Sequence, residues 1–555
     1  MKLKSTIAAG LALAFTSSLH AQGFTTTEFS YLNPAPGANF SYQPIVTIGD
    51  RVPLTGGGAG TEFAFVGIPD AMGIYKDPAN GQNILFVAHE LGNTALSEPV
   101  VGAARYRGAW VSRYVLANSG AILSGGVAHG NLFTENTFVA ATSPREGSPI
   151  AFTRFCSGSF AGREHGLDRP MFFTNEETFG SASYETAQGA QTVVIVDGAM
   201  HTLPDLGRVG RETSLVQPRR DSITSIFSFE DAGSPSYVYQ YIGTKQRRSA
   251  SALDKNGLTN GKIYILCGRD AQHNEGTFTT GSLPMKWVEI VGGSAMTDAQ
   301  LLAAADAAGS FGFVRVEDAE FDPVQPTRTL FLATTGGSGP NRLGRLYNLQ
   351  LNPLNPVANC TLNVVYNADT IVTPGGSYTG AATGTLTGTP TGSLGNYTGG
   401  VLANGVDYPV SIDNIAVSKD WIVINEDRNT PANAVFAQYN RNGGVWTLNR
   451  NAGLAAKLQS TFNYAAIEAR DGHGPIADRG LWESSGTIAS DAIFGPGTFV
   501  INVQAHTTTV NLNGGGTAAA IRTNIPKPGG GVYTRTEAVS KFVEDGQVLI
   551  MRPIP

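Results

Sequence analysis

Short runs of apolar and β-branched residues recur along the chain, and six of them read alike. They occupy the segments Ile84–Glu90, Met171–Glu177, Ser225–Asp231, Thr329–Thr335, Trp421–Asp427 and Thr498–Gln504. Such runs, closely followed by Gly, Asn or Ser, are typical of strands that end in turns. Four of the six end in an acidic residue or an acidic pair. The pattern predicts six equivalent strands, four of which carry a carboxylate at the same end.

A further strand follows most of these segments. The predicted followers are Ala109–Leu116, Thr192–Asp197, Tyr237–Ile242, Gly344–Leu351 and Ala434–Tyr439. A strand–turn–strand unit repeated over hundreds of residues is typical of a radial architecture. We therefore predict an all-β fold, a β-propeller of about six blades with long loop insertions. A pair of β-sandwiches is the alternative, but it leaves unexplained why the acids fall at the same point of the repeated segment.

The first 21 residues have the features of a secretory signal peptide. A basic start precedes the apolar run Ile7–Phe15, and small residues lead to a cut after Ala21. The apolar run is too short to span a bilayer, and no twin arginine precedes it. We predict a Sec-type signal at residues 1–21, a single propeller domain at residues 22–555, and a periplasmic or extracellular protein without a membrane span.

Two other segments depart from the strand pattern. Residues 373–400 consist almost entirely of Gly, Thr, Ser, Ala and Pro and carry no charge, which predicts a surface insertion. Residues Ser294–Gly309 combine helix-start residues with leucines and alanines, so they are the best candidate for a helix.

Composition narrows the possible classes of protein. The 555 residues include 38 Lys+Arg and 44 Asp+Glu, for a net charge of −6, so nucleic-acid binding is not expected. Hydrophobic residues make up 41%, which excludes a disordered chain, and 68 glycines exclude a helical bundle. The three cysteines, Cys156, Cys267 and Cys360, are an odd number, so a disulfide framework cannot hold the fold together. Three buried thiols are one interpretation, and one metal-binding thiol among them is the other.

The acids at equivalent strand positions have a chemical consequence. Inner strands of a propeller converge on a central channel, so these carboxylates would face one another. Several carboxylates so close together either take up protons or bind cations, and oxygen-rich ligand sets suit Ca²⁺, Mg²⁺, Mn²⁺ or ferric iron. For any single acid, a solvated turn residue is the alternative interpretation.

Familiar catalytic motifs are absent from the sequence. His89-Glu90 is not a zinc-protease motif, because Asn93 stands where the second His is needed. The chain has neither a G-x-S-x-G nucleophile elbow nor a phosphate-binding loop ending in Gly-Lys-Ser/Thr. A serine hydrolase or a zinc peptidase is therefore not supported.

Several stretches, taken in order, together resemble one known family. They are His89–Glu90, Thr153–Gly158, Phe173–Glu177, Leu206–Glu212, Phe229–Asp231, Tyr237–Tyr241, Phe313–Asp318, Ile412–Ile415, Trp482–Gly486 and Phe499–His506. These stretches resemble motifs of the PhoX-type alkaline phosphatases, exported bacterial propeller enzymes with an iron–calcium cluster. The resemblance covers about residues 80 to 510.

The resemblance implies roles for the matching positions. The implied carboxylate metal ligands are Glu90, Glu212, Glu317 and Asp413, and Cys156 would be a thiolate ligand. Arg315 would bind the phosphate, since a guanidinium offers a fork to its oxygens. Weaker candidates are Asn414, Glu483 and Glu177. The implied cofactors are Ca²⁺ and Fe³⁺, which neutralise phosphate charge and activate a nucleophile.

The leading interpretation is thus a secreted metal-dependent phosphatase of small phosphate esters, acting as a monomer at a multi-metal site in the channel. One alternative is a calcium-dependent, lactonase-like propeller enzyme, which needs no thiolate. Another is a non-catalytic exported propeller that binds a partner. That last alternative predicts Glu90, Glu212, Glu317 and Asp413 more than about 10 Å apart, because ligand–metal distances are only about 2.0–2.6 Å.

Overall fold

A computed structural model describes residues 23–186, 188–337, 339–371, 400–401, 407–427, 443–471, 473–476, 482–505, 509–512, 517–519 and 521–555. The predicted signal peptide, the Gly/Thr-rich segment up to residue 399 and the predicted strand at residues 434–439 lie outside the described residues.

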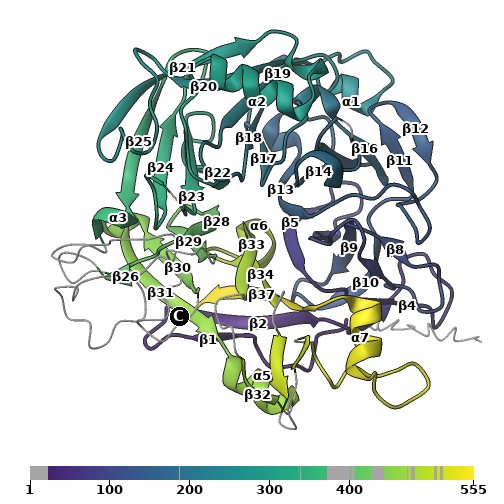
Figure 1. Cartoon of the computed structure of the whole chain (residues 1–555). Coiled ribbons are helices and arrows are strands. Elements are labelled where there is room, and N and C mark those ends of the chain that lie inside the picture. Colours follow the sequence, from purple (N-terminus) through teal and green to yellow (C-terminus); the bar gives the residue numbers. More distant parts are fainter. Residues whose placement is uncertain are drawn as a thin grey trace, which may run out of the picture.

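Six antiparallel blades surround one central channel in the described part of the chain (Figure 1). The innermost strands are β5 (Pro69–Lys76), β13 (Phe155–Ala161), β17 (Ser214–Val216), β22 (Val316–Phe321), β28 (Ile412–Val417) and β33 (Glu483–Ala489). Neighbouring blades contact one another around the ring, and β33 meets β5 to close it. The predicted all-β propeller of about six blades is confirmed, and the sandwich alternative is wrong.

Three more strands complete each blade. The second strands are β6 (Asn83–His89), β14 (Met171–Glu176), β18 (Ile223–Phe229), β23 (Thr329–Thr334), β29 (Trp421–Glu426) and β34 (Phe499–Ala505). The third strands are β9 (Trp110–Leu116), β15 (Thr192–Val196), β19 (Val238–Thr244), β24 (Arg345–Gln350), β30 (Val445–Asn449) and β37 (Asp545–Pro553). The fourth strands are β10 (Ile122–Val127), β16 (Ala199–Thr202), β20 (Lys262–Gly268), β25 (Cys360–Asn367), β31 (Ala455–Phe462) and β2 (Phe40–Thr47).

The six repeated sequence segments are therefore the second strands of the blades, not the innermost ones. The hydrophobic runs of β6, β23, β29 and β34 are nearly continuous because a second strand packs against neighbouring blades on both faces. The innermost strands are harder to detect, since polar or small residues interrupt their apolar ones, as in Val-Glu-Asp-Ala-Glu-Phe of β22.

The N-terminal region closes the ring. Strand β2 pairs with the C-terminal strand β37, with Tyr42 opposite Met551. Strand β1 (Leu32–Pro34) pairs with β31 in the preceding blade, with Leu32 opposite Phe462. Residues from the two ends of the chain thus share one sheet, which ties the first and last blades together.

Buried apolar clusters lie between adjacent blades. Between the first two blades, for example, Phe86 of β6 and Phe172 of β14 stack with ring centroids 5.1 Å apart. The third and fourth blades share a further link, because β21 (Ser282–Ile290) pairs with both β20 and β25 to form one nine-stranded sheet. The three cysteines are all buried and unpaired.

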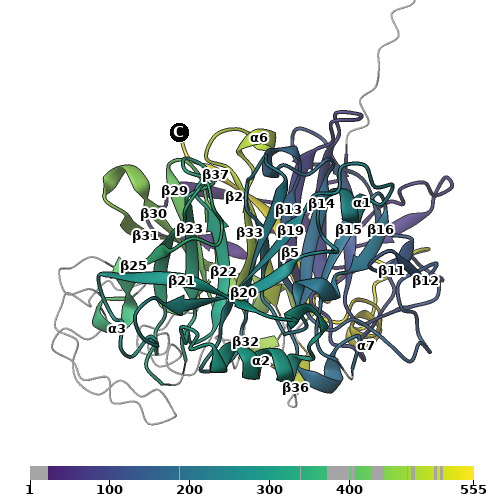
Figure 2. The same cartoon turned by 90° about the horizontal axis from the view of Figure 1, so that it is seen from above.

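The remaining elements decorate the edges of the blades (Figure 2). The predicted helix at Ser294–Gly309 is confirmed as α2 (Asp298–Ala307), which Thr297 caps in a capping box with Gln300. The other helices are α1 (Ala252–Lys255), α3 (Ala368–Ile371), α5 (Tyr464–Asp471), α6 (Asp491–Phe494) and α7 (Arg535–Phe542). The short strands are β3 (Arg51–Pro53), β4 (Glu62–Ala64), β7 (Leu96–Ser97), β8 (Tyr106–Arg107), β11 (Asn131–Thr134), β12 (Thr137–Ala140), β26 (Gly400–Val401), β27 (Asp407–Tyr408), β32 (His473–Ile476), β35 (Thr509–Leu512) and β36 (Thr517–Ala519). Within the described residues, no helix has the length and apolar character needed to cross a membrane.

Candidate metal centre

Each innermost strand contributes one potential metal ligand at or just before its first residues. The six side chains, in blade order, are Asp70, Cys156, Glu212, Glu317, Asp413 and Glu483. All six are buried. Because the six strands start at the same mouth of the channel, these side chains form one ring.

The second strands add another set of side chains at the same mouth. In blade order they are Glu90, Glu177, Asp231, Thr335, Asp427 and Gln504. Antiparallel pairing places the end of each second strand beside the start of the innermost strand, as in the pair Glu483–Gln504. Residues of both sets line one cavity of about 180 Å³ at this mouth. Its walls carry eight carboxylates, two guanidinium groups and the Cys156 thiol.

The backbone near these residues is specialised in a repeated way. The strand register shifts across the ligand position in β5, β13, β22 and β28, and slightly after it in β33. Such bulges redirect side chains and are frequent near functional sites. Two residues before the ligand, four blades hold a non-glycine residue with positive φ: Ile68, Arg154, Arg315 and Ser411. Recurrence in four blades indicates that this turn belongs to the fold.

In the acidic pairs that end the second strands, the two carboxylates have different roles. The first member is held by backbone N–H groups: Glu176 accepts hydrogen bonds from Thr153, Tyr184 and Gln191. Glu426 likewise accepts from the backbone of Val410 and Gly444. The second members, Glu177 and Asp427, line the cavity. One carboxylate of each pair therefore fixes the loop, and the other points into the cavity as a potential metal ligand.

The potential ligand atoms fall into overlapping groups of three, each within 4.8 Å of one another. The groups are Asp70–Cys156–Glu212, Glu90–Cys156–Glu177, Glu177–Glu212–Asp231, Glu212–Glu317–Asp413 and Asp413–Asp427–Glu483. Glu212 belongs to three of them. The separation beyond about 10 Å that a non-catalytic propeller predicts is therefore wrong for Glu212, Glu317 and Asp413.

The thiol of Cys156 tests whether a cation fits this site. Its Sγ lies 3.0 Å from Asp70 Oδ2 and 3.0 Å from Glu212 Oε1. A thiol has one proton and cannot donate it to both carboxylates at once. A cation among the three atoms would satisfy all of them, and a bound metal deprotonates a thiol outright. The donor set of carboxylates with one thiolate thus fits metal ions.

The electrostatics of the metal-free site point the same way. Burial and the neighbouring Asp231 carboxylate raise the pKa of Glu212 to about 8. Burial followed by nearby carboxylates raises the pKa values of Asp70, Asp413 and Cys156 well above their usual range. Without cations, the cavity holds several of these groups in their protonated form.

Two arginines offset part of the negative charge. Arg315 donates from Nε to Asp231 Oδ1 at 3.0 Å, and its Nη2 lies 2.9 Å from Glu317 Oε1. Burial alone would raise the pKa of Asp231, but the Arg315 guanidinium holds it below its usual value. Arg154 pairs with Glu90 at 2.7 Å and with Glu177 at 2.5 Å.

The structure brings together nearly all of the residues singled out from the sequence. Those lining the cavity are Glu90, Cys156, Glu177, Glu212, Arg315, Glu317, Asp413 and Glu483. Asn414 is not among the lining residues. It donates to Ser157 Oγ at 2.5 Å and accepts from Ser485 Oγ at 2.9 Å, so it braces two innermost strands.

Sequence reasoning missed four residues of the site: Asp70, Arg154, Asp231 and Asp427. Asp231 and Asp427 end the repeated segments as Glu90 and Glu177 do, but the resemblance assigned roles only to Glu90 and, more weakly, to Glu177. Asp70 follows a proline, and Pro-Asp is typical of a turn. Arg154 could be found only by aligning the blades, where it matches Arg315.

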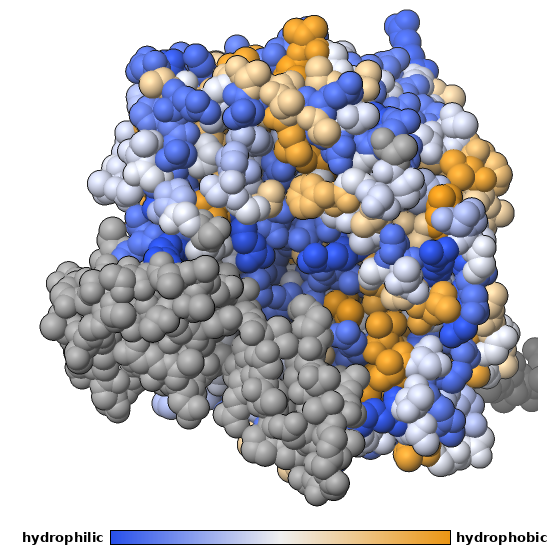
Figure 3. Space-filling view, in the orientation of Figure 1, coloured by the Kyte–Doolittle hydropathy of each residue, from blue (hydrophilic) through white to orange (hydrophobic). Residues whose placement is uncertain are grey.

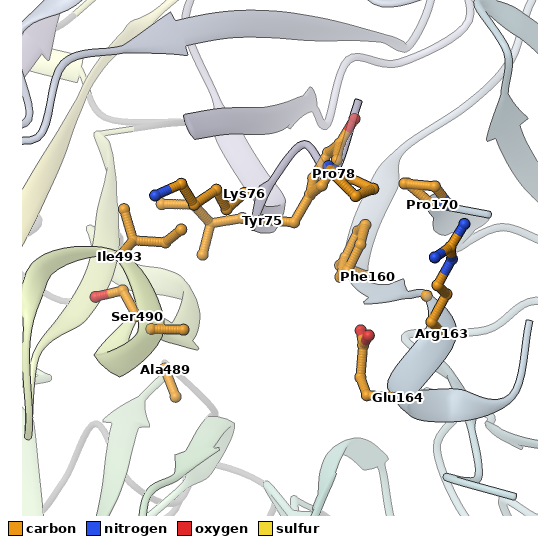
Figure 4. A pocket seen from close by; sticks show the side chains of 13 residues that line it. Tyr75, Lys76, Pro78, Phe160, Arg163, Glu164, Pro170, Ala489, Ser490 and Ile493 are labelled. Carbon is orange, nitrogen blue, oxygen red and sulfur yellow. The ribbon is translucent and has the colours of Figure 1, made fainter. Parts of the chain in front are cut away.

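The face toward the viewer of Figure 1 has many hydrophilic side chains around its recessed middle (Figure 3). A second hollow, of about 370 Å³, lies further along the same strands, between α6 and the turn Arg163–His165 (Figure 4). Its walls are largely apolar and include Ile74, Phe160 and Ile493. Phe160 follows Cys156 by four residues, about 13 Å along an extended strand. None of the ligand groups found among the described residues lies in this hollow.

Fold and site together define a six-bladed propeller with a carboxylate-lined cavity at one mouth of its channel. Among solved structures, the chain is similar to PhoX of Pseudomonas fluorescens in complex with vanadate, a transition state analogue. The TM-score is 0.57, with 13% sequence identity, over 96% of this chain and 98% of that chain. This likeness establishes the fold and confirms the resemblance seen in the motifs at that level. No protein-family model and no curated protein sequence matches the chain.

Proposed function

We propose that the protein is a metal-dependent hydrolase of phosphate esters and that the channel cavity is its active site. The observation that carries the proposal is the composition of this cavity: a ring of buried carboxylates, one thiol and two guanidinium groups. Carboxylates concentrate cations, and guanidinium groups bind tetrahedral oxyanions. The PhoX structure of the same fold, solved with vanadate as a transition state analogue, supports the same chemistry.

Two sets of ligands would hold different cations. The first three blades supply Asp70, Glu90, Glu177 and Glu212 around the Cys156 thiol, a set that suits a transition metal such as ferric iron. The later blades supply only oxygen ligands, from Glu317, Asp413, Asp427 and Glu483, which suits Ca²⁺. When bound, such cations neutralise the charge of a phosphoryl group and lower the pKa of bound water.

The protein's own residues would position the substrate. The Arg315 fork faces the cavity and would bind two phosphoryl oxygens. The cavity, at about 180 Å³, is smaller than the 300–1,000 Å³ typical of pockets that enclose a whole drug-sized ligand. It therefore suits a small anionic group, with the organic part of the ester outside. We infer that the substrates are small phosphorylated molecules and that the protein acts as an exported monomer.

The test is hydrolysis of a chromogenic phosphomonoester by the purified mature protein. Activity should disappear with a chelator and return with Ca²⁺ together with ferric iron. Glu317→Gln and Arg315→Ala should abolish or strongly reduce turnover. Glu320→Gln, which changes a carboxyl group of the same strand outside the cavity, should not. No hydrolysis under any metal condition contradicts the proposal.

The same preparation distinguishes the alternatives. A lactonase-like enzyme would contain Ca²⁺ alone and would open lactones without cleaving phosphate esters. A non-catalytic binding propeller would cleave neither substrate, whatever metal it contained.

A further inference from the structure

We infer that Arg154 is a second anion-binding residue of the channel cavity, acting together with Arg315 on the same phosphoryl group. The inference rests on the proposed function for the identity of the substrate, but its test measures phosphate binding and does not require hydrolysis. The structural reason is that the two arginines occupy one and the same position of the blade repeat.

The equivalence is exact in sequence spacing and backbone. Arg154 lies two residues before Cys156 with φ +49°, and Arg315 lies two residues before Glu317 with φ +53°. Cys156 and Glu317 are the ring ligands of their blades. Ile68 and Ser411 hold this position in two other blades. The fold therefore fixes the backbone at this point without requiring arginine. Among the described residues, two blades direct a guanidinium into the cavity, those of Arg154 and Arg315.

The contacts of the two arginines are also alike. Arg154 bridges Glu90, from the first blade, and Glu177, from its own blade. Arg315 bridges Asp231 of the preceding blade and Glu317 of its own, and its Nη2 also lies 3.6 Å from Asp427 Oδ2 of the following blade. Each guanidinium thus spans the boundary between two blades and rests on carboxylates that lie deeper in the site.

Exposure shows which groups an incoming anion reaches first. The Arg154 side chain is 49% exposed, whereas its partners Glu90 and Glu177 are 7% and 8% exposed. Its ion pairs use Nε and Nη2. Within the described residues, Nη1 of Arg154 has no hydrogen-bond acceptor. A guanidinium that covers buried acids, keeps a spare donor and reaches solvent is suited to bind an oxyanion from outside.

Two fixed guanidinium groups select the chemistry of the ligand. A tetrahedral oxyanion with at least three terminal oxygens can accept from both at once, as inorganic phosphate and a phosphomonoester do. The alternative is that Arg154 only neutralises Glu90 and Glu177, as a structural ion pair.

The experiment measures binding of inorganic phosphate to the purified full-length mature protein by calorimetry, alongside its metal content. Arg154→Ala should weaken phosphate binding about tenfold or more with unchanged metal content, since one charge-assisted contact is lost. Arg154→Lys should recover part of the loss. Arg163→Ala, an exposed arginine beside the apolar hollow, is the matched control and should bind like the wild type.

The outcomes separate the two roles and the two proposals. Unchanged phosphate affinity in Arg154→Ala, or loss of metal in place of phosphate affinity, overturns the inference. Wild-type protein that binds no phosphate also overturns it. If the wild type binds phosphate through Arg154 yet hydrolyses no ester, the proposed hydrolase fails while this assignment stands. Thermal unfolding of Arg154→Ala and of Arg154→Lys, which keeps the charge, shows whether each variant is still folded.

Discussion

Removing the metal should destabilise the fold, and the loss should grow as the pH rises from about 5 to about 8. The reason is the carboxyl group of Glu212, whose pKa rises from 4.5 to about 8 in the metal-free protein. Between these two values the folded state keeps a proton that the unfolded chain has released. Folding is then linked to proton binding. The contribution of Glu212 to the free energy of unfolding is therefore fully present below pH 4.5, and it is lost as the pH rises until the folded group ionises near pH 8.

The size of the effect follows from the same two values. A tenfold change in protonation corresponds to about 1.4 kcal/mol, so the gap for Glu212 alone corresponds to about 5 kcal/mol. Many domains are stable by only about 5–15 kcal/mol in total. A cation bound by Glu212 would remove this loss of stability, because it stabilises the ionised carboxylate and so makes the bound proton unnecessary at neutral pH.

The assay is urea unfolding at pH 5, 6.5 and 8 of the protein as purified and after chelation. The difference in free energy of unfolding between the two forms should widen with pH. Glu212→Gln should narrow it. Glu320→Gln is the control, because burial raises the pKa of Glu320 to about 7 outside the cavity, so its effect should be equal in both forms. A difference that stays constant or shrinks as the pH rises would refute the reasoning.

Three further predictions concern single features of the molecule. Cys156→Ala should lower bound iron, measured by elemental analysis, and an unchanged iron content would remove the thiol from the site. Arg315→Lys should raise KM for a phosphomonoester about tenfold or more, because the lysine lacks the fork, whereas an unaltered KM would contradict the role of Arg315. Glu176→Ala should lower the free energy of unfolding by about 3 kcal/mol in urea titrations, since three backbone N–H groups lose their acceptor, and a loss below about 1 kcal/mol would show that water replaces it.

The sequence was most informative for strands whose two faces are both buried. Strands β6 and β29 have apolar side chains on both faces, so they contain the unbroken apolar runs Ile-Leu-Phe-Val-Ala and Trp-Ile-Val-Ile, which are easy to recognise. Strands β13 and β33 read Phe-Cys-Ser-Gly-Ser-Phe-Ala and Glu-Ser-Ser-Gly-Thr-Ile-Ala. Their small polar residues reflect a channel wall, and this composition resembles that of a loop. The repeat therefore predicted the number of blades correctly but assigned the visible strand to the wrong place within each blade.

The site was predictable in kind but not in full. Acids at the ends of the second strands indicated convergence, which follows from closing the strands into a ring. Asp70 gave no such signal, because its role depends on a bulge after Pro69 that only pairing with β6 reveals. The same holds for Arg154, whose half-exposed side chain resembles a surface arginine until its blade is superposed on that of Arg315.

The two rings of side chains also explain how a nearly sixfold scaffold builds an asymmetric site. In two blades the second-strand position carries a neutral residue, Thr335 or Gln504, and each donates a hydrogen bond to a ring carboxylate: Thr335 to Glu317, and Gln504 to Asp70 at 2.8 Å. In these two blades the second-strand residue orients a ring carboxylate, whereas in the other four blades it adds a carboxylate of its own. The negative charge consequently gathers in two groups, one around the Cys156 thiol and one around Asp413, which share Glu212 as a common member. The proposed site for two kinds of cation thus requires no departure from the propeller fold, only different residues at two positions of each blade.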